Sequence, residues 1–289
     1  MKETLFVSFS GGRTSAYMCW WLLNNKSAEY DFIFVFANTG QEAEETLIFL
    51  DMCDKAFGLN LVWLEAVINP KRGKGTAHKV VSYESATRDA SIFDDMCAVY
   101  GIPNTSYPHC NRELKLAPIQ SYKKSLGYSR KHLTAIGIRS DEIDRMNVSA
   151  ADEGLTYPLI KWSMTTKAEI IHWWGLQSFD LEIPEHKGNC NTCWKKSDRK
   201  LYTLAQEDIS LFEPFASLEG KYGSVNAPDR DRVFWRKNRS TAQLLSDASK
   251  PFKTFVDHKP ELQLRLITDN AFEVKDIDIE GDCGGSCEI

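Results

Sequence analysis

Three short apolar runs are separated by longer segments of helical spacing in the first part of the chain. Residues 4–9, 31–37 and 60–67 are dense in β-branched and aromatic side chains, which predicts buried strands. Residues 14–24 and 42–57 lie between them, and their length and apolar spacing predict helices. Strands that alternate with helices pair in parallel, because a parallel connection needs a crossover. The pattern therefore predicts an α/β fold with a parallel sheet flanked by helices.

The pattern is less regular in the middle of the chain. We predict a mobile basic loop over residues 69–80, either solvated or close to a bound phosphate. Residues 132–138 predict a fourth strand. Residues 158–162 precede a further helix, which is expected over residues 166–174.

The chain becomes more polar after about residue 200. Residues 226–240 are loop-like and basic, and residues 262–267 predict a last strand or a short helix. We therefore predict a first domain over residues 1–200, followed by a mixed, loop-rich C-terminal extension over residues 201–289.

Composition narrows the class of protein. The 289 residues are 43% hydrophobic and 26% charged, which excludes a disordered or collagen-like chain. With 35 Lys and Arg against 40 Asp and Glu, the net charge of −5 argues against nucleic-acid binding over the whole surface, but leaves a local basic patch open. We find neither a signal peptide nor an apolar stretch of about 18 residues, so we expect a cytoplasmic protein without a membrane segment. Eight cysteines are too few for a disulfide scaffold, and thiols stay reduced in the cytoplasm.

Residues 8–15 (SFSGGRTS) join the first predicted strand to the first predicted helix. Two glycines let the backbone approach a ligand closely, and the hydroxyl groups of Ser10, Thr14 and Ser15 add donors. The N-terminus of the helix favours an anion. The Gly-Lys-Ser/Thr ending of a P-loop NTPase is missing, which disfavours γ-phosphate transfer of that kind. The segment predicts a phosphate site, and the alternative is a glycine turn that only starts a helix.

The same residues resemble the Ser-Gly-Gly-x-x-Ser pyrophosphate loop (PP-loop) of the adenine-nucleotide α-hydrolase superfamily. Within it, the chain resembles the phosphoadenosine phosphosulfate (PAPS) reductase family through four further segments in the family's order. These are FANTG at 36–40, HCNRELK at 109–115, GIRSDEIDR at 137–145 and YPLIKW at 157–162. Asn38 stands where aspartate is commoner in the family. The resemblance covers roughly residues 4–200.

This resemblance implies a Rossmann-like sheet that binds an adenine nucleotide, ATP or PAPS, at the carboxyl ends of its strands. The domain over residues 1–200 is then the nucleotide-binding one. The implied phosphate or sulfate contacts are Ser8, Ser10, Gly11, Gly12, Arg13, Thr14 and Ser15, and the nucleoside contacts are Asn38, Thr39 and Gly40. Arg112, Lys115, Gly137, Arg139 and Arg145 are implied around the anionic ligand, since guanidinium groups suit phosphate geometry. For the arginines, an ion pair with a neighbour such as Asp141 or Glu142 is the alternative.

The cysteines fall into separate groups. Cys190 and Cys193 form a Cys-x-x-Cys unit that could bind a metal or act as a redox pair. Cluster-bearing members of the resembled family hold a [4Fe–4S] cluster with such a unit and an earlier cysteine pair, of which only Cys110 is present here. The metal ligands implied are Cys110, Cys190 and Cys193, with Cys287 as a further candidate. The alternatives are zinc, bound by the same thiols with His109, His186 or a tail cysteine, and unligated thiols. Cys19, Cys53 and Cys97 lie in apolar contexts that predict core positions.

The C-terminal residues DIEGDCGGSCEI contain Cys283 and Cys287. Reductases of the resembled family carry a nucleophilic cysteine in a C-terminal Glu-Cys-Gly motif, which Asp282-Cys283-Gly284 resembles loosely. The resemblance implies that Cys283 attacks the sulfur of a sulfonucleotide and that a second thiol reduces the product, with Cys287 as a candidate. A disordered tail is the alternative.

Three functions follow as hypotheses. The first is an enzyme of the PAPS reductase family with a small-molecule nucleotide substrate, iron–sulfur chemistry and a thiol reductant such as thioredoxin. The second is an ATP-dependent sulfurtransferase that adenylates a small molecule or a nucleic acid. Residues 71–79 and 230–239, with Phe234 and Trp235 interleaved, could contact such a nucleic acid. The third is a nucleotide-binding sensor without turnover, and the sequence leaves the oligomeric state open.

Overall fold

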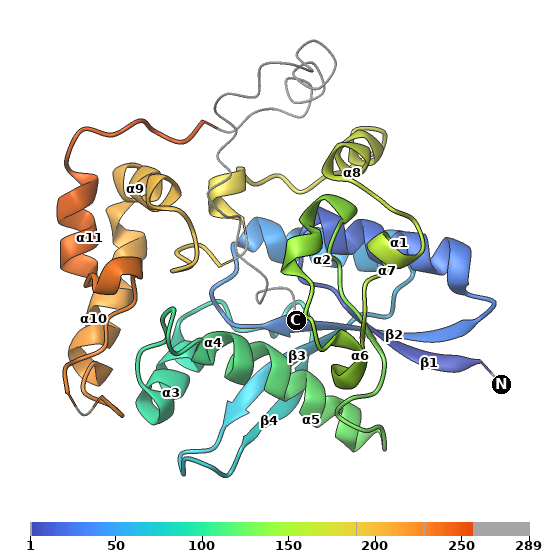
Figure 1. The fold of residues 1–289 in the computed structure, drawn as a ribbon, viewed down its shortest axis with the longest axis horizontal. Coiled ribbons are helices and arrows are strands. Elements are labelled where there is room, and N and C mark those ends of the chain that lie inside the picture. Colours follow the sequence, from blue (N-terminus) through green and yellow to red (C-terminus); the bar gives the residue numbers. More distant parts are fainter. Residues whose placement is uncertain (1, 189, 228, 257–289) are drawn as a thin grey trace.

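A six-stranded sheet organises the chain (Figure 1). The computed structural model describes residues 2–188, 190–227 and 229–256. The strand order is β4-β3-β2-β1-β5-β6. The strands are β1 (Glu3–Ser8), β2 (Tyr30–Asn38), β3 (Val62–Ile68), β4 (Thr76–Val81), β5 (Thr134–Ala135) and β6 (Leu155–Thr156). All neighbours pair in parallel except β3 and β4, so the predicted α/β class with a Rossmann-like sheet is confirmed.

Helices cover both faces of this sheet (Figure 1). On one face lie α1 (Arg13–Lys26), α2 (Glu44–Phe57), α7 (Pro158–Lys161) and α8 (Lys167–Trp174). On the other face lie α3 (Ser91–Tyr100), α4 (His109–Asn111), the π-helical turn η1 (Arg112–Leu116) and α5 (Ala117–Ser125). The short elements η2 (Ser140–Arg145), α6 (Ala150–Glu153) and η3 (Glu185–Lys187) connect these layers.

The side chains of β1 show why both faces need cover. Leu5 and Val7 pack with Leu47 of α2 on one face, whereas Phe6 packs with Ile119 of α5 on the other. All of these side chains are at most 2% exposed. A strand that is buried on both sides reads as a continuous apolar run, which is the pattern that the sequence shows.

The prediction of a loop over residues 69–80 is wrong in its second half. Thr76–Val81 forms β4, which pairs antiparallel with β3 at the edge of the sheet. The sequence did not predict this strand, because part of an edge strand faces solvent. Its Lys and His residues therefore resemble those of a loop. Lys79 also has a partner within the sheet, since its Nζ lies 2.8 Å from Oε2 of Glu65.

The described part of the C-terminal extension is built on three helices joined by loops. These are α9 (Asp198–Glu207), α10 (Glu213–Tyr222) and α11 (Thr241–Ala248). They pack against α3 in one apolar cluster that includes Phe93, Leu204 and Phe215. Phe234 and Trp235 are at most 1% exposed in that cluster, so the hypothesis that these two aromatic side chains contact a nucleic acid is wrong. The predicted element at residues 262–267 lies outside the described residues.

In the part of the chain that the structure describes, no helix combines the length and the apolar character needed to cross a membrane.

Candidate functional site

The predicted phosphate loop lies at the carboxyl end of β1, directly before α1. Its two serine hydroxyls share a hydrogen bond, with Ser10 Oγ 2.9 Å from Ser15 Oγ. Ser15 Oγ also accepts from the amide of Ser10 and donates to the carbonyl of Gly12. These bonds fix the conformation of the loop, while no side chain of the described residues caps the start of α1. The first amide groups of that 14-residue helix are therefore available to an anion.

Two glycines allow the loop to pack this tightly. Gly11 has a φ of +87°, and a Cβ there would lie 2.7 Å from Cγ2 of Thr46 on α2. Gly137 follows β5, and its Cβ would lie 3.1 Å from Cα of Ser15. A side chain at either position would push on the loop. Steric crowding therefore explains why glycine occupies both positions.

The predicted arginines around this loop are engaged with carboxylates. Arg139 donates from Nη1 to Thr14 Oγ1 at 3.2 Å, and it also pairs with Asp141 and Glu142 at 3.0 and 2.9 Å. Arg145 pairs with the same Glu142 at 2.5 Å. Arg139 is therefore both a neighbour of the phosphate loop and a member of an ion-pair cluster.

Arg13 follows the loop directly but is bound elsewhere. Its Nε donates to Asp180 Oδ1 at 2.6 Å, and its Nη2 donates to the carbonyl of Leu181. Its backbone carbonyl accepts from Trp174 Nε1. These bonds fix α1 against the segment after α8, which is a structural role for the side chain.

Asn38 ends β2 and is fully buried. Its Nδ2 donates to Glu65 Oε1 at 2.7 Å and to the carbonyl of Thr87 at 2.8 Å, and its Oδ1 accepts from the amide of Gly40. Glu65 is a charged residue inside the apolar β3 and is also fully buried. An aspartate at position 38 would place a second carboxylate against it, which explains the asparagine.

Glu65 is held as a carboxylate by several donors. Besides Asn38 and Lys79, the amide and the hydroxyl of Thr87 donate to it at 2.6 and 3.0 Å. Burial raises the pKa of Glu65, but the hydrogen bonds from Lys79, Thr87 and Asn38 outweigh burial and lower it below its ordinary value. This buried, satisfied network fixes the ends of β2 and β3, next to residues 38–40, which are predicted to contact the nucleoside.

The Cys-x-x-Cys unit lies against that segment. Cys190 forms an antiparallel bridge with Glu42, and its Sγ is 3.8 Å from Thr39 Oγ1 and 3.9 Å from Glu42 Oε1. Glu42 in turn accepts from the amide and the hydroxyl of Thr39, each at 2.9 Å. The structure therefore brings Cys190 beside Thr39 and Gly40, although 150 residues separate them in the sequence.

The predicted metal ligands are brought together only in part. Cys190 and Cys193 pack against each other, whereas Cys110 packs in the apolar cluster of α3 and α9. Within the described ranges, no three His, Cys, Asp or Glu side chains are grouped to hold a metal ion. A cluster or a structural zinc ion usually takes four protein ligands, so the two thiols need further partners. The candidate Cys287 lies outside the described residues, as does the predicted nucleophile Cys283. The [4Fe–4S] cluster and its zinc alternative stay predictions. Cys19, Cys53 and Cys97 are fully buried, as expected of core residues.

The predicted Arg112 and Lys115 lie on η1, a π-helical turn inserted between α4 and α5. Such turns are frequent at functional sites. Arg112 pairs with Glu113 at 2.6 Å and lies 3.2 Å from Nδ1 of His109. Burial, joined by the positive charges of Arg112, Arg232 and Arg72, lowers the pKa of His109 to about 4. The imidazole is therefore neutral at pH 7 and lies among three arginines.

Sequence reasoning missed several of these groups. Glu42 and Glu65 were not singled out, although a charged residue within the apolar β3 run was a visible sign of a special role. Arg232 and Asn226 could not be connected with Arg72 from the sequence, because the turn after β3 and the loop after α10 meet only in the folded chain.

Known proteins resemble this chain in the same region. The model of the phosphoadenosine phosphosulfate reductase domain matches residues 4–174. An uncharacterized nin region protein of Escherichia phage lambda, ORF290, is 35% identical over 212 residues, which are 72% of each chain. Two uncharacterized proteins of Methanocaldococcus jannaschii are similar too. MJ0973 is 25% identical over 80% of this chain and 51% of its own length, and MJ0066 is 28% identical over 49% of this chain and 24% of its own.

Proposed function

Because the chain belongs to the phosphoadenosine phosphosulfate reductase family, we propose that it binds an adenine nucleotide along the carboxyl edge of its sheet and carries out thiol-dependent sulfur chemistry there. One observation carries the proposal. The Cys190 thiol lies 3.8 Å from Thr39 Oγ1, in the segment after β2, and the phosphate loop follows the neighbouring β1. Adjacent strands are about 5 Å apart, so a nucleotide can reach both segments.

Two groups of residues bind the two ends of the nucleotide. The amides at the start of α1 and the hydroxyls of Ser10 and Ser15 receive the phosphate or sulfate end, and Arg139 adds a guanidinium beside Thr14. The backbone of residues 38–40, fixed by Glu65, receives the nucleoside. Cys190 lies beside Thr39 at the end of β2, and the loop that receives the phosphate or sulfate end follows the neighbouring strand β1.

In the reductase reaction, the Cys283 thiolate attacks the sulfonate sulfur of PAPS. The sulfur–oxygen bond to the nucleotide breaks, adenosine 3′,5′-bisphosphate leaves, and the sulfonate stays on Cys283. A second thiol attacks the sulfur of Cys283, releases sulfite and leaves a disulfide, which a dithiol reductant restores. We propose Cys190 as this second thiol because of its place beside Thr39. If Cys190 and Cys193 instead hold a [4Fe–4S] cluster, that cluster would add electrostatic stabilisation of the sulfonate, and Cys287 would be the second thiol.

The second candidate is ATP-dependent sulfur transfer, in which an acceptor oxygen attacks the α-phosphorus of ATP and expels pyrophosphate. A hydrosulfide-level sulfur nucleophile then attacks the activated carbon, the carbon–oxygen bond breaks, and AMP leaves. This candidate is favoured by a specific observation. Arg72 and Arg232 line a basic pocket, and a sulfonucleotide reductase needs no such additional polyanion site.

Product analysis separates the two reactions. The full chain, purified without oxygen and assayed for iron, acid-labile sulfide and zinc, is incubated with PAPS and a dithiol, or with ATP and an acceptor. Sulfite that disappears in Cys283→Ser supports the reductase, and pyrophosphate that depends on the acceptor supports sulfur transfer. Neither product, together with no nucleotide binding, would refute the proposal.

Mass spectrometry tests the assignment of the second thiol. Cys190→Ser should accumulate a sulfo adduct on Cys283 after PAPS is added, because the releasing thiol is gone. Cys287→Ser is the matched control and should turn over. An adduct that accumulates in Cys287→Ser instead would assign the step to Cys287.

A further inference from the structure

We propose that the pocket lined by Arg72 and Arg232 binds the phosphate backbone of a single-stranded nucleic acid. This goes beyond the nucleotide reaction, and for the sulfur-transfer candidate it names the class of acceptor. The pocket has a volume of about 470 Å³ and is lined by Arg72, Ser224, Asn226, Ala227 and Arg232.

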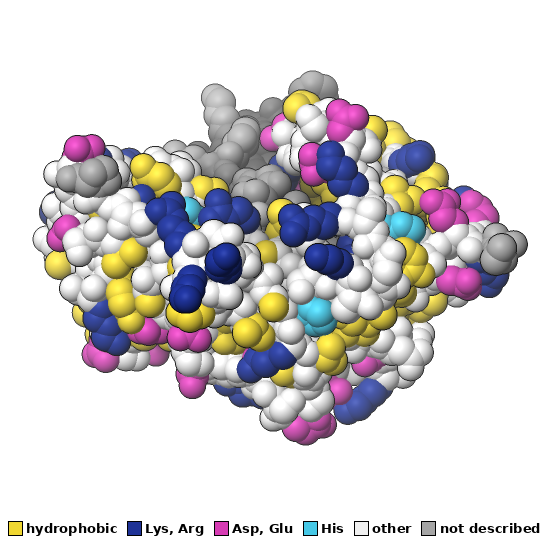
Figure 2. All heavy atoms as spheres, turned by 90° about the horizontal axis from the view of Figure 1, so that it is seen from below, with side chains coloured by type: hydrophobic (Ala, Val, Ile, Leu, Met, Phe, Trp, Pro, Cys, Tyr) yellow, Lys and Arg dark blue, Asp and Glu magenta, His cyan; other side chains and the backbone are white. Residues whose placement is uncertain are grey.

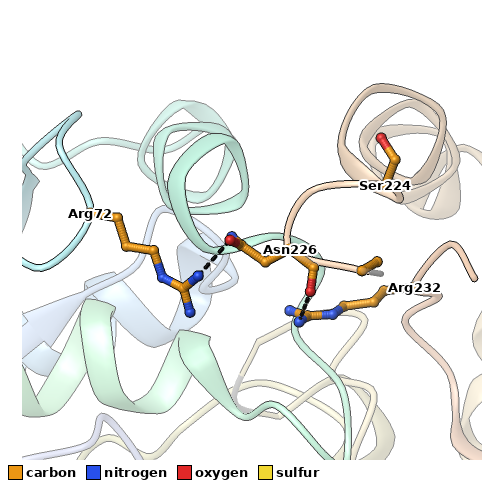
Figure 3. A pocket seen from close by; sticks show the side chains of 5 residues that line it. Arg72, Ser224, Asn226 and Arg232 are labelled. Carbon is orange, nitrogen blue, oxygen red and sulfur yellow. Dashed lines mark hydrogen bonds between the residues drawn. The ribbon is translucent and has the colours of Figure 1, made fainter. Parts of the chain in front are cut away.

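Two arginines from distant parts of the chain meet at this pocket. Arg72 lies in the turn between β3 and β4, and Arg232 lies in the loop after α10. Figure 3 shows them reaching toward Asn226 from opposite sides. Arg72 Nη1 donates to Asn226 Oδ1 at 2.5 Å, and Arg232 Nη2 donates to the backbone carbonyl of Asn226. The two guanidinium groups are thereby held on either side of one hollow.

The charges of these two arginines are not neutralised by the described part of the chain. The contacts of Arg72 and Arg232 are to an amide oxygen, to backbone carbonyls and to an aromatic ring, and neither forms an ion pair with a described carboxylate. Two guanidinium groups that face one hollow without a counter-charge repel each other, and an anion between them removes that repulsion. A phosphate matches the geometry, since each guanidinium can donate two hydrogen bonds.

Arg232 is also held in place by stacking. Its Cζ lies 3.8 Å from the ring centroid of Tyr107, and its Nη1 donates to the carbonyl of Tyr100. Tyr107 in turn stacks on His109. A guanidinium that is ordered before binding loses less side-chain entropy when the anion arrives.

The surroundings favour a polymer over a single phosphate ion. Lys71 and Lys74 lie in the same turn as Arg72, and both are exposed. Arg112 on η1 acts on the same His109 imidazole as Arg72 and Arg232 do; it pairs with Glu113, and its side chain is 55% exposed. Figure 2 shows Lys and Arg side chains gathered across the middle of the face seen from below, with most Asp and Glu toward its rim. A row of cations fits the repeating phosphates of a strand, and a flexible single strand can bend into a hollow.

The Arg72 turn and residues 38–40 both follow the carboxyl ends of strands, so they lie at the same end of the sheet. The turn with Arg72 leaves the carboxyl end of β3, next to the carboxyl end of β2, from which residues 38–40 leave. Neighbouring strands are about 5 Å apart, and one nucleotide of an extended strand spans a similar distance. A strand held by the two arginines can therefore reach the thiol pair within a few nucleotides.

Fluorescence anisotropy of the full chain tests the proposal. The probe is a labelled oligothymidylate of about 12 nucleotides at about 50 mM salt. Arg72→Gln/Arg232→Gln should weaken binding at least about tenfold and lower the log–log salt slope by about 1.4, or about 0.7 for each lost phosphate contact. The matched control is Lys2→Gln/Lys131→Gln, which removes the same charge at the amino ends of β1 and β5 and should bind as the wild type does.

Additional variants and competitors distinguish loss of the site from loss of the fold and identify the kind of anion that binds. Arg232 bonds to the backbone, so thermal unfolding is measured for each variant, and Arg72→Gln alone, at an exposed residue, should still weaken binding several-fold. Equal binding by wild type and double variant would overturn the proposal. Displacement of the probe by millimolar inorganic phosphate would reassign the pocket to a small anion, and equally tight binding of a duplex would overturn the single-strand assignment. Titration of ATP and PAPS into the same variants tests the nucleotide site separately, and their affinities should not change.

Discussion

The arginines at the phosphate loop and the arginines at the basic pocket differ in how their charges are balanced. Arg13, Arg139 and Arg145 each pair with a carboxylate within 3.0 Å, whereas Arg72 and Arg232 form no ion pair with a described residue. The first group is balanced before any ligand arrives, and the second is not. Balanced arginines position a loop and its ligand, whereas unbalanced arginines attract an anion from solution.

The first prediction disturbs the balance at the nucleotide edge. Asn38→Asp places a carboxylate beside buried Glu65 and removes a donor, so we expect a loss of about 3 kcal/mol in the free energy of unfolding. The pair raises the pKa of one carboxyl, so the folded state binds an extra proton and its stability falls as pH rises above the ordinary carboxyl range. Urea unfolding at pH 5 and pH 8 measures this. Asn38→Asp/Glu65→Gln is the control that should recover stability, and equal losses at both pH values would contradict the explanation.

The second prediction removes the steric fit of the phosphate loop. Gly11→Ala adds a Cβ 2.7 Å from Thr46 at a positive φ, which costs about 2 kcal/mol and should weaken nucleotide binding about 30-fold. Calorimetric titration with ATP and PAPS measures the affinity. Gly220→Ala on α10 is the matched control, because a Cβ there meets no atom of the described residues within 4 Å. Unchanged affinity in Gly11→Ala would show that the loop does not hold the ligand.

The third prediction tests whether a balanced arginine still contacts the ligand. Arg139→Gln should weaken nucleotide binding about tenfold, since one charge-assisted hydrogen bond is lost. Oligonucleotide binding should not change, because Arg139 is outside the basic pocket. Lys131→Gln, which removes one charge at the opposite edge of the sheet, is the control. A stronger effect on the oligonucleotide than on the nucleotide would reverse the assignment of the two sites.

The fourth prediction compares the salt dependence of the two sites. Raising salt from about 50 to about 200 mM should weaken oligonucleotide binding at least about sevenfold, which is the share of the two phosphate contacts of Arg72 and Arg232. Nucleotide binding at the balanced site should weaken only about twofold, since Asp141 and Glu142 already screen Arg139. Parallel titrations in the same buffers give both values. Equal salt dependence would remove the distinction between the two groups of arginines.

Much of the fold could be predicted because the central strands are buried on both faces. The strands β1, β2 and β3 coincide closely with the apolar runs at residues 4–9, 31–37 and 60–67. The glycine loop lies between β1 and α1, as predicted. The edge strand β4 was missed because its exposed side chains resemble those of a loop. The two-residue β5 was predicted too long, since two hydrogen-bonded residues give little local pattern.

The site was predictable where its residues are local and unpredictable where they are distant. The loop of residues 10–15 and the segment 38–40 each carry a recognisable sequence. The engagement of Arg13 with Asp180 and the burial of Phe234 depend on partners far along the chain. Spacing alone could not show that Cys190 reaches Thr39 while Cys110 packs elsewhere.

The sequence by itself determined the parallel sheet, the glycine loop between β1 and α1, and the family, because strand burial and a glycine turn leave a pattern in neighbouring residues. Only the tertiary structure decided which charges are balanced. Arg72 and Arg232 are 160 residues apart, and Glu65 needs Asn38, Lys79 and Thr87 from three other segments. Such balance depends on distances of a few ångströms between groups that the chain brings together only by folding.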